Sequence, residues 1–279
     1  MPDFVYDPAF NVGLALAVGM LAQALARHLR IPGIVLLLAA GVLLGPDLLG
    51  IVRPESLGDG LRMLVGFAVA VILFEGGMNL NLRRLRREAV SIRRLATWGA
   101  FVTAVGGALA ARLLLDWSWT LSALFGTLVI VTGPTVINPL LRRIRVNPNL
   151  ATVLEAEGVL VDAIGAIVAV VALEVALSPS GESLALGSSH LMSRLGFGAV
   201  LGTVAGLLLA LLLRSERWVP EGLENVFTLS LALALYQLSN GLLEESGIVT
   251  VTAAGLAVGN VKTRALSDLK EFKEQLTVL

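Results

Sequence analysis

The chain of 279 residues contains no cysteine and only two histidines, His28 and His190. The lack of cysteine excludes a disulfide framework, a thiolate nucleophile and a cysteine-ligated metal. Two histidines are too few for a histidine-rich metal site. Charge is scarce too, because 15% of the residues are charged, against about 25% in soluble domains. Basic and acidic residues balance at 21 each, which excludes a nucleic-acid binder that relies on bulk positive charge.

Apolar residues dominate instead, with 56% of the chain hydrophobic and a mean hydropathy of +0.83. A helix needs about 20 mostly apolar residues to cross a bilayer. The sequence therefore predicts an all-α integral membrane protein with nine transmembrane helices. Their apolar runs cover residues 8–26, 31–46, 61–80, 95–111, 117–141, 150–177, 195–213, 225–243 and 246–261.

Lysine and arginine are unequally divided between alternate loops. One side of the predicted membrane carries 17 of them and the other side carries four. Because cytoplasmic loops carry the basic excess, we predict an extracytoplasmic N-terminus and a cytoplasmic Leu279. The loop after the third run is the most basic, and we interpret it as an orientation signal, with lipid binding as the alternative. Its arginines are Arg83, Arg84, Arg86, Arg87, Arg93 and Arg94.

Two acidic residues lie deep inside predicted spans, where each costs about 2.5–3.5 kcal/mol and is a functional candidate by default. Asp162 lies halfway across the sixth run, in VLEAEGVLVDAIGAIVAVV. Glu75 lies near the same depth in the third run, in VILFEGGMNLNL. Gly76 and Gly77 follow it and allow a neighbouring helix to approach closely. Structural alternatives are an ion pair for Asp162 and a reach to the inner interface for Glu75.

Glu155 and Glu157 lie nearer the inner end of the sixth run. Glu155 precedes Asp162 by seven residues, so both lie on one face of the helix. The two glutamates are candidates to support a site at Asp162. Alternatively, they reach cytoplasmic water or a structural arginine.

The fifth run is interrupted by the segment VTGPTVINP. Pro134 lacks an amide hydrogen and clashes with the preceding turn, and Gly133 loosens that turn further. Thr132 offers a hydroxyl, and an interrupted helix frees backbone carbonyls of the kind that bind ions in secondary transporters. The alternative is an ordinary proline kink.

The two carboxylates and the interrupted helix fall at similar depth on three different spans. Carboxylate, hydroxyl and carbonyl oxygens together can replace the water around a hard monovalent cation. The same carboxylates also bind protons. The pattern therefore predicts one site that holds either a cation or a proton.

At these residues the chain resembles the bacterial sodium/proton antiporter family of the NhaP and sodium/hydrogen-exchanger type. The resemblance runs through RIPGIVLLLAAGVLLGP, LFEGGMNL, VTGPTVINPLLRR and EAEGVLVDAIGA, and it covers nearly the whole chain. It implies a fold of about thirteen helices built from two inverted repeats, assembled as a homodimer in the bacterial inner membrane. A role in pH homeostasis follows from the same resemblance.

The resemblance also implies roles for single residues. Asp162 carries the ion and the proton, Glu75 is a second ion ligand, and Thr132 supplies a carbonyl ligand. Glu157 corresponds to a glutamate that pairs with an arginine on a later helix. The bound metal is then the transported cation itself, and no cofactor is implied. The supporting residues are Glu155, Glu157, Gly133, Pro134 and Gly158.

Three positions depart from the family pattern. The family usually has an aspartate where Gly133 stands, an asparagine at Val161 and often a serine at Gly158. Electrogenic relatives carry two adjacent aspartates in the sixth span, whereas this chain has Asp162 alone. The resemblance therefore implies an electroneutral exchange of one proton for one cation, with sodium or lithium as the expected ion.

Nine spans are fewer than the resemblance implies, so we expect a C-terminally truncated chain. Residues 1–177 would form the first repeat, with the ion-site helices in its third, fifth and sixth spans. Residues 178–194 would form an extracytoplasmic linker. Residues 195–279 would form a linker helix and the incomplete start of the second repeat.

Two other functions stay open. One is potassium/proton efflux, with a soluble nucleotide-binding domain after residue 279. The other is a non-transporting membrane sensor or scaffold, suggested by the polar groups missing at Gly133 and Val161. An enzyme is disfavoured because the sequence shows no nucleophile–base pair, metal cluster or phosphate loop. The expected partners are thus a monovalent cation, protons, the lipid bilayer and a second copy of the chain.

Overall fold

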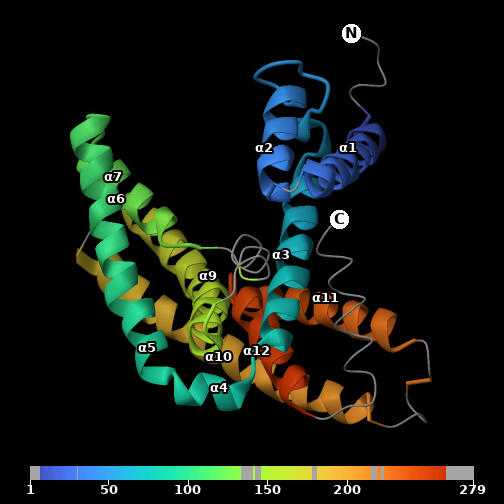
Figure 1. Ribbon diagram of the computed structural model, residues 1–279. Helices are drawn as coiled ribbons and strands as arrows, with labels where there is room; N and C mark the ends of the chain where they lie inside the picture. Colours follow the sequence, from blue (N-terminus) through green and yellow to red (C-terminus); the bar gives the residue numbers. More distant parts are fainter. Residues whose placement is uncertain are drawn as a thin grey trace. The chain divides into compact units, whose positions relative to one another are not determined.

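The computed structural model describes residues 7–29, 31–132, 141, 146–177, 181–214, 219–220 and 223–261. Within these ranges every regular element is a helix and no strand occurs (Figure 1). The described chain divides into two compact units, and the boundary falls after Val69, inside helix α3 (Asp59–Asn79).

The first unit contains α1 (Pro8–Leu29), α2 (Gly33–Leu44) and the short helix η2 (Pro54–Leu57). A Cβ atom at Gly33 would collide with the Gln23 side chain, so the glycine lets α2 begin directly against α1. Asn11 is buried in α1 and its Oδ1 accepts a hydrogen bond from the Arg53 amide at 2.6 Å. This contact ties α1 to the loop that leads into η2.

The second unit begins at Ala70 and holds the rest of α3 and the remaining helices. Asn81 starts the helix after α3, because its side chain accepts hydrogen bonds from the amides of Arg83 and Arg84. The elements of this unit are α4 (Leu82–Arg87), α5 (Ala89–Arg94), the π-helix η3 (Leu95–Gly99), α6 (Ala100–Leu114), α7 (Trp119–Val129), α9 (Pro148–Leu177), α10 (Gly181–Leu212), α11 (Glu224–Leu242) and α12 (Gly247–Asn260).

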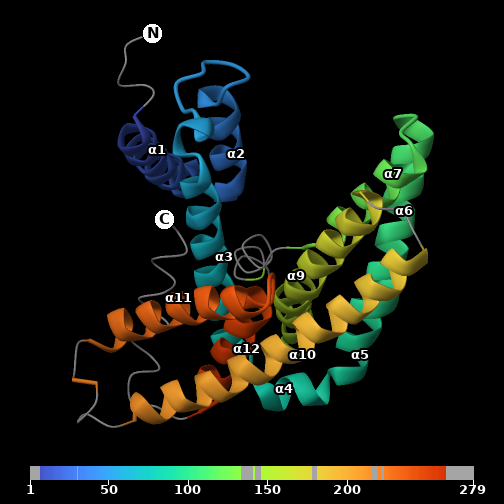
Figure 2. The same ribbon diagram turned by 180° about the vertical axis from the view of Figure 1, so that it is seen from behind.

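Glycines bring α10 and α12 into backbone contact, and the two helices lie side by side from both viewing directions (Figure 1, Figure 2). Gly198, Gly202 and Gly206 recur every fourth residue on α10, so they line one face. A Cβ at Gly202 would meet the Thr250 carbonyl oxygen, and one at Gly206 would lie 2.6 Å from the Ala254 carbonyl oxygen. Small residues at such positions are typical of helix packing in membranes.

Five helices of the described chain are long and apolar enough to cross a bilayer: Pro8–Leu29, Asp59–Asn79, Ala89–Leu114, Pro148–Leu177 and Ser189–Leu212. Three further apolar helices are shorter, namely Gly33–Leu44, Trp119–Val129 and Gly247–Asn260. The all-helical, multi-pass prediction is confirmed to this extent. The number of nine transmembrane helices is not confirmed and stays a prediction, as does the division into two repeats.

The linker expected over residues 178–194 is helical from Gly181 onward, because α10 begins there and continues to Leu212. The stretch between Pro179 and Pro220 contains no proline, so nothing forces the helix to start later. The arginine-rich loop after α3 is also helical, in α4 and α5. The sequence predicts a linker and a loop at these two places from their polar residues, and the arginines of α4 and α5 are exposed on the helices.

Candidate functional site

Helix α9 carries four of the predicted site residues and has contacts with α4, α5, α7, α10 and α12. Asp162 and Glu157 are half-buried on it. The Oδ1 atom of Asp162 is buried and has no hydrogen-bond partner among the described residues. A buried carboxylate oxygen without a hydrogen-bond partner lowers the stability of the folded protein. Binding a proton or a cation would offset this free-energy cost.

Thr132 and Glu157 are brought together from consecutive predicted spans. Helix α7 ends at Val129, and the chain continues without helical structure to Thr132. There the Thr132 Oγ1 donates a hydrogen bond of 2.8 Å to Glu157 Oε1. Gly165 allows this approach, since a Cβ there would lie 2.9 Å from Val131 Cγ2.

The other residues expected around the interruption are only partly visible. Gly133 and Pro134 lie outside the described residues. Gly158 is buried on α9, next to Glu157 in sequence, and Glu155 is half-buried two residues before Glu157. The described residues thus place one hydroxyl contact at the end of α7, between Thr132 and Glu157.

Glu75 is buried near the end of α3, with 8% of its surface exposed. The glycines after it permit close helix packing, as the sequence predicts. A Cβ at Gly76 would lie 2.8 Å from Val159 Cγ2 on α9, and one at Gly77 would lie 3.0 Å from the Leu256 amide on α12. Gly76 is next to Glu75, and Val159 is three residues before Asp162. The contact between α3 and α9 therefore lies within one helical turn of Glu75 and of Asp162.

Sequence reasoning missed Asn260, which joins α12 to the end of α3. Its Nδ2 donates to the Leu80 carbonyl at 2.8 Å, and its Oδ1 accepts from the Leu82 amide at 2.7 Å. One side chain therefore satisfies the backbone on both sides of the break between α3 and α4. Its only signal in the sequence is an amide residue at the end of an apolar run.

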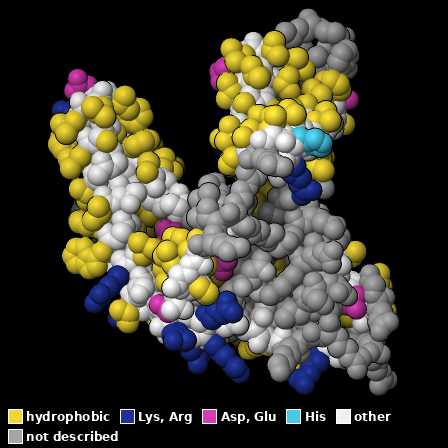
Figure 3. Space-filling view, in the orientation of Figure 1, with side chains coloured by type: hydrophobic (Ala, Val, Ile, Leu, Met, Phe, Trp, Pro, Cys, Tyr) yellow, Lys and Arg dark blue, Asp and Glu magenta, His cyan; other side chains and the backbone are white. Residues whose placement is uncertain are grey.

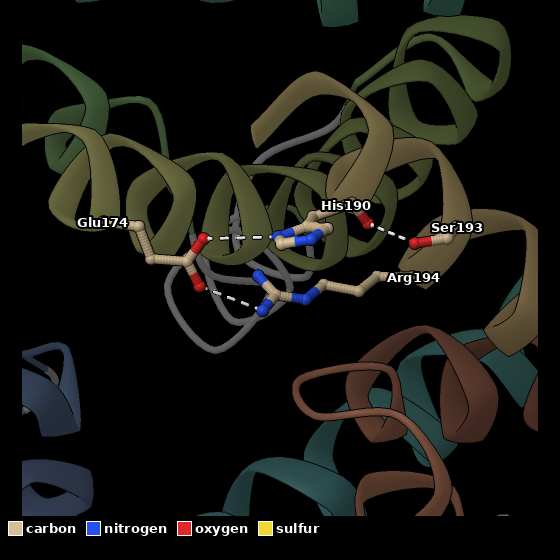
Figure 4. Close-up of polar contacts among 4 residues, drawn as sticks. All are labelled: Glu174, His190, Ser193 and Arg194. Carbon is tan, nitrogen blue, oxygen red and sulfur yellow. Dashed lines mark hydrogen bonds and ion pairs between the residues drawn. The ribbon is translucent and has the colours of Figure 1, made fainter. Parts of the chain in front are cut away.

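An ion pair between α9 and α10 was also missed. Arg194 is buried, and its Nη2 lies 2.9 Å from Glu174 Oε1. Figure 4 shows the Glu174 carboxylate facing both this guanidinium and His190, whose Nδ1 is 3.8 Å from the second carboxylate oxygen. The available signal was an acid in the last turns of the sixth run, together with a lone arginine on the side poor in basic residues.

These features define a class: a multi-pass helical membrane protein with acidic residues buried among its helices. The family model described as "Sodium/hydrogen exchanger, transmembrane" matches residues 13–278. The chain belongs to this sodium/hydrogen exchanger family, and the resemblance drawn from the motifs is confirmed.

Relatives of known name are similar over most of this chain. The K(+)/H(+) antiporter NhaP2 of Shewanella oneidensis is 30% identical over 258 residues, which cover 91% of this chain and 44% of that protein. The Na(+)/H(+) antiporter 1 of Methanocaldococcus jannaschii is 30% identical over 264 residues, covering 91% of this chain and 60% of that protein. The chain spans about half the length of the curated relatives it matches.

A solved structure supports the same fold. The sodium proton antiporter MjNhaP1 from Methanocaldococcus jannaschii superposes with a TM-score of 0.78 at 27% sequence identity. The match covers 95% of this chain and 66% of that structure. The arrangement of helices described above is therefore an antiporter fold, as far as the chain extends.

Proposed function

We propose that the full-length protein is a secondary transporter that exchanges a monovalent cation for protons, with Asp162 as the shared binding group. The observation that carries this proposal is the buried Asp162 Oδ1 without a hydrogen-bond partner among the described residues. Ionisable residues inside membrane spans line ion paths, and the family and its named relatives agree with this chemistry.

The proposed mechanism is competition at one carboxylate. On one side of the membrane Asp162 releases its proton and binds the cation, and on the other side a proton displaces the cation. The same competition makes the apparent KM for the cation rise as the pH falls. Because no second acid adjoins Asp162, each cycle moves one proton against one cation and is electroneutral.

Glu75 and Thr132 complete the proposed ligand set. The Thr132 hydroxyl is already engaged by Glu157, which holds the residue in place and leaves its backbone carbonyl oxygen as the group offered to an ion. Glu75 adds a second carboxylate from α3, the helix that contacts α9 at Gly76. Carboxylate and carbonyl oxygens suit sodium and lithium, which are the ions we expect.

Potassium is the second candidate, and one observation favours it. The relative from Shewanella oneidensis is named a K(+)/H(+) antiporter. Gly133 and Val161 stand where the family has more polar side chains, so the site of this chain offers fewer oxygen and nitrogen ligands than the family pattern. The ion must therefore be identified by direct comparison of the three cations.

The remaining parts of the proposal follow from the charge distribution and the family. The protein would reside in a bacterial plasma membrane as a homodimer and serve pH homeostasis. The side of the membrane that carries 17 basic residues would face the cytoplasm, and Leu279 would lie on that side. Cysteine labelling from either side of the membrane checks this orientation, since these 279 residues contain no cysteine to interfere.

The decisive experiment uses the full-length protein in everted membrane vesicles. A pH gradient is established, and its collapse is followed after addition of sodium, lithium or potassium. Collapse is expected for the wild type and for Asp116→Asn, a matched change at an exposed loop residue. Asp162→Asn should show none. Exchange at the wild-type rate in Asp162→Asn would remove Asp162 from the mechanism, and no collapse in the folded wild type would favour the sensor or scaffold.

A further inference from the structure

A strongly basic surface covers α4 and α5, and we call it the arginine face. Figure 3 shows Lys and Arg side chains gathered over these two helices, next to the apolar surface of α6. All six of its guanidinium groups are exposed. The arginine face consists of Arg83, Arg84, Arg86, Arg87, Arg93 and Arg94.

The guanidinium groups of the arginine face lack the partners that three other arginines of the described chain have. Arg112 donates to the Trp117 carbonyl and lies near Asp116, Arg194 pairs with Glu174, and Arg53 donates to a backbone carbonyl. In the part of the chain that the structure describes, no ion pair or hydrogen bond involves the guanidinium groups of the arginine face. Glu88 is the one acidic residue between Leu82 and Leu95.

The opposite side of the same helices is apolar and anchored. Ile92 is buried in one cluster with Ala156 and Val159 of α9, and Leu85 packs against this cluster. Leu82 and Leu85 recur at the spacing that places them on one helix face. The arginines are therefore held on a fixed surface beside α9 and do not belong to a free loop.

Electrostatic repulsion among the arginines of the arginine face favours the binding of an anionic partner. Arg83 and Arg87 are four residues apart, and Arg84 and Arg87 are three apart, so like charges face each other on a helix of only six residues. Like charges at these spacings destabilise a helix. Phosphate groups relieve that repulsion, and arginine binds them through two parallel hydrogen bonds.

Two exposed aromatic rings place this surface at the level of lipid headgroups. Trp98 is 70% exposed and Phe101 is 59% exposed, and their ring centroids lie 6.2 Å apart in an edge-to-face contact. Tryptophan in membrane proteins concentrates at the boundary between headgroups and hydrocarbon. Trp98 follows Arg94 by four residues in the continuous helix of α5, η3 and α6.

We propose that the arginine face binds the phosphate headgroups of anionic phospholipids and that this binding stabilises the packing of α4 and α5 against α9. The lipid is expected to lie with its headgroup on the arginines and its acyl chains along the apolar surface that begins at Trp98 and Phe101. This inference concerns binding and stability, and it stands whether or not the protein transports ions.

The test compares two matched pairs of substitutions in the purified full-length protein. The first is Arg84→Gln with Arg87→Gln on the arginine face. The control is Arg27→Gln with Arg214→Gln, two exposed arginines outside it. Phosphatidylglycerol or phosphatidylcholine is added to each protein in detergent, and Tm is measured. Purified protein is used so that a changed membrane orientation cannot affect the result.

Phosphatidylglycerol should raise the Tm of the wild type and of the control pair by about 4 °C more than phosphatidylcholine does. The Arg84→Gln, Arg87→Gln protein should lose most of this difference. Arg84→Lys with Arg87→Lys keeps the charge without the paired hydrogen bonds, and an intermediate shift is expected. An equal phosphatidylglycerol effect in the wild type and in the glutamine pair would overturn the proposal and leave the arginines as an orientation signal only.

Discussion

Two polar regions are buried among the helices of the second unit, and they are built in opposite ways. Between α11 and α12, the Ser239 Oγ lies 2.7 Å from both the Ser246 Oγ and the Thr250 Oγ1, and all three residues are fully buried. On α9, the Asp162 Oδ1 is buried with no partner in the described chain. The first region satisfies its own hydrogen bonds. The second leaves a carboxylate oxygen with no hydrogen-bond partner among the described residues.

Under the proposed function, this difference separates polar groups that hold the helices together from a carboxylate that would bind the transported cation or proton. A hydroxyl cluster that is internally satisfied contributes to stability and has no capacity left to bind an ion. An unpartnered carboxylate lowers stability and retains that capacity. The comparison therefore makes opposite predictions for stability and for transport at the two places.

The largest expected effect is at Asp162. Asp162→Asn should lower the exchange rate by at least about 100-fold, because the amide cannot release a proton to make room for a cation. The same variant should keep or raise the wild-type Tm, because it removes the burial cost of a charge. Vesicle exchange and thermal unfolding, measured on one preparation, check both parts. A large fall in Tm would show that Asp162 has a structural partner.

Ser246 should behave in the reverse manner. Ser246→Ala removes contacts to Ser239 Oγ and to the Leu243 carbonyl, and it should destabilise the protein by about 1–2 kcal/mol. Exchange per folded molecule should be unchanged. Denaturant unfolding of the purified protein gives the stability, and vesicle assays normalised to the amount of folded protein give the rate.

A control variant tests whether the cluster acts as a unit. Ser239→Ala, Ser246→Ala and Thr250→Val together remove all three hydroxyls, so no unpaired group is left behind. This triple variant should cost less than the sum of the three single changes. Strict additivity, or a loss of exchange in any of these variants, would mean that the cluster does not have the purely structural role that the comparison gives it.

Thr132 combines features of both regions. Its hydroxyl donates a hydrogen bond to Glu157, and its backbone carbonyl is proposed to bind the ion. Thr132→Val should raise the KM for the cation about 5-fold, since the lost hydrogen bond loosens the segment after α7. Thr132→Ser keeps the hydroxyl and should stay within about 2-fold of the wild type. Initial rates at graded cation concentrations measure this, and an unchanged KM in Thr132→Val would remove the positioning role.

The sequence predicted what depends on local pattern. Hydropathy predicted α9 over residues 150–177, and the helix runs from Pro148 to Leu177. The glycine pair after Glu75 predicted close helix contact, which the structure shows at Gly76 and Gly77. Composition predicted a membrane protein, and the resemblance of the motifs around the buried acids predicted the family.

The contacts that were missed join residues with no periodic relation. Arg194 and Glu174 are 20 residues apart, and Asn260 reaches the backbone of Leu82 across 178 residues. Such pairs depend on which helices pack together, and the single sequence does not specify those partners. The helical start of α10 was missed for a different reason, because its polar residues resemble those of a loop and the absence of proline was the better indicator.

The smallest expected effect is at Asn260, whose hydrogen bonds to the Leu80 carbonyl and from the Leu82 amide lie at one end of α3. Asn260→Ala should cost about 1 kcal/mol in global stability. Its clearer consequence is local: the Leu82 amide loses its acceptor, so its hydrogen exchange should accelerate while amides in the middle of α9 keep their rates. Asn260→Asp retains the acceptor for Leu82 and should slow that amide again. If neither variant changes the hydrogen exchange of the Leu82 amide, Asn260 does not hold the break between α3 and α4. The close packing of α3 against α12 at Gly77, Gly255 and Gly259 then holds it instead.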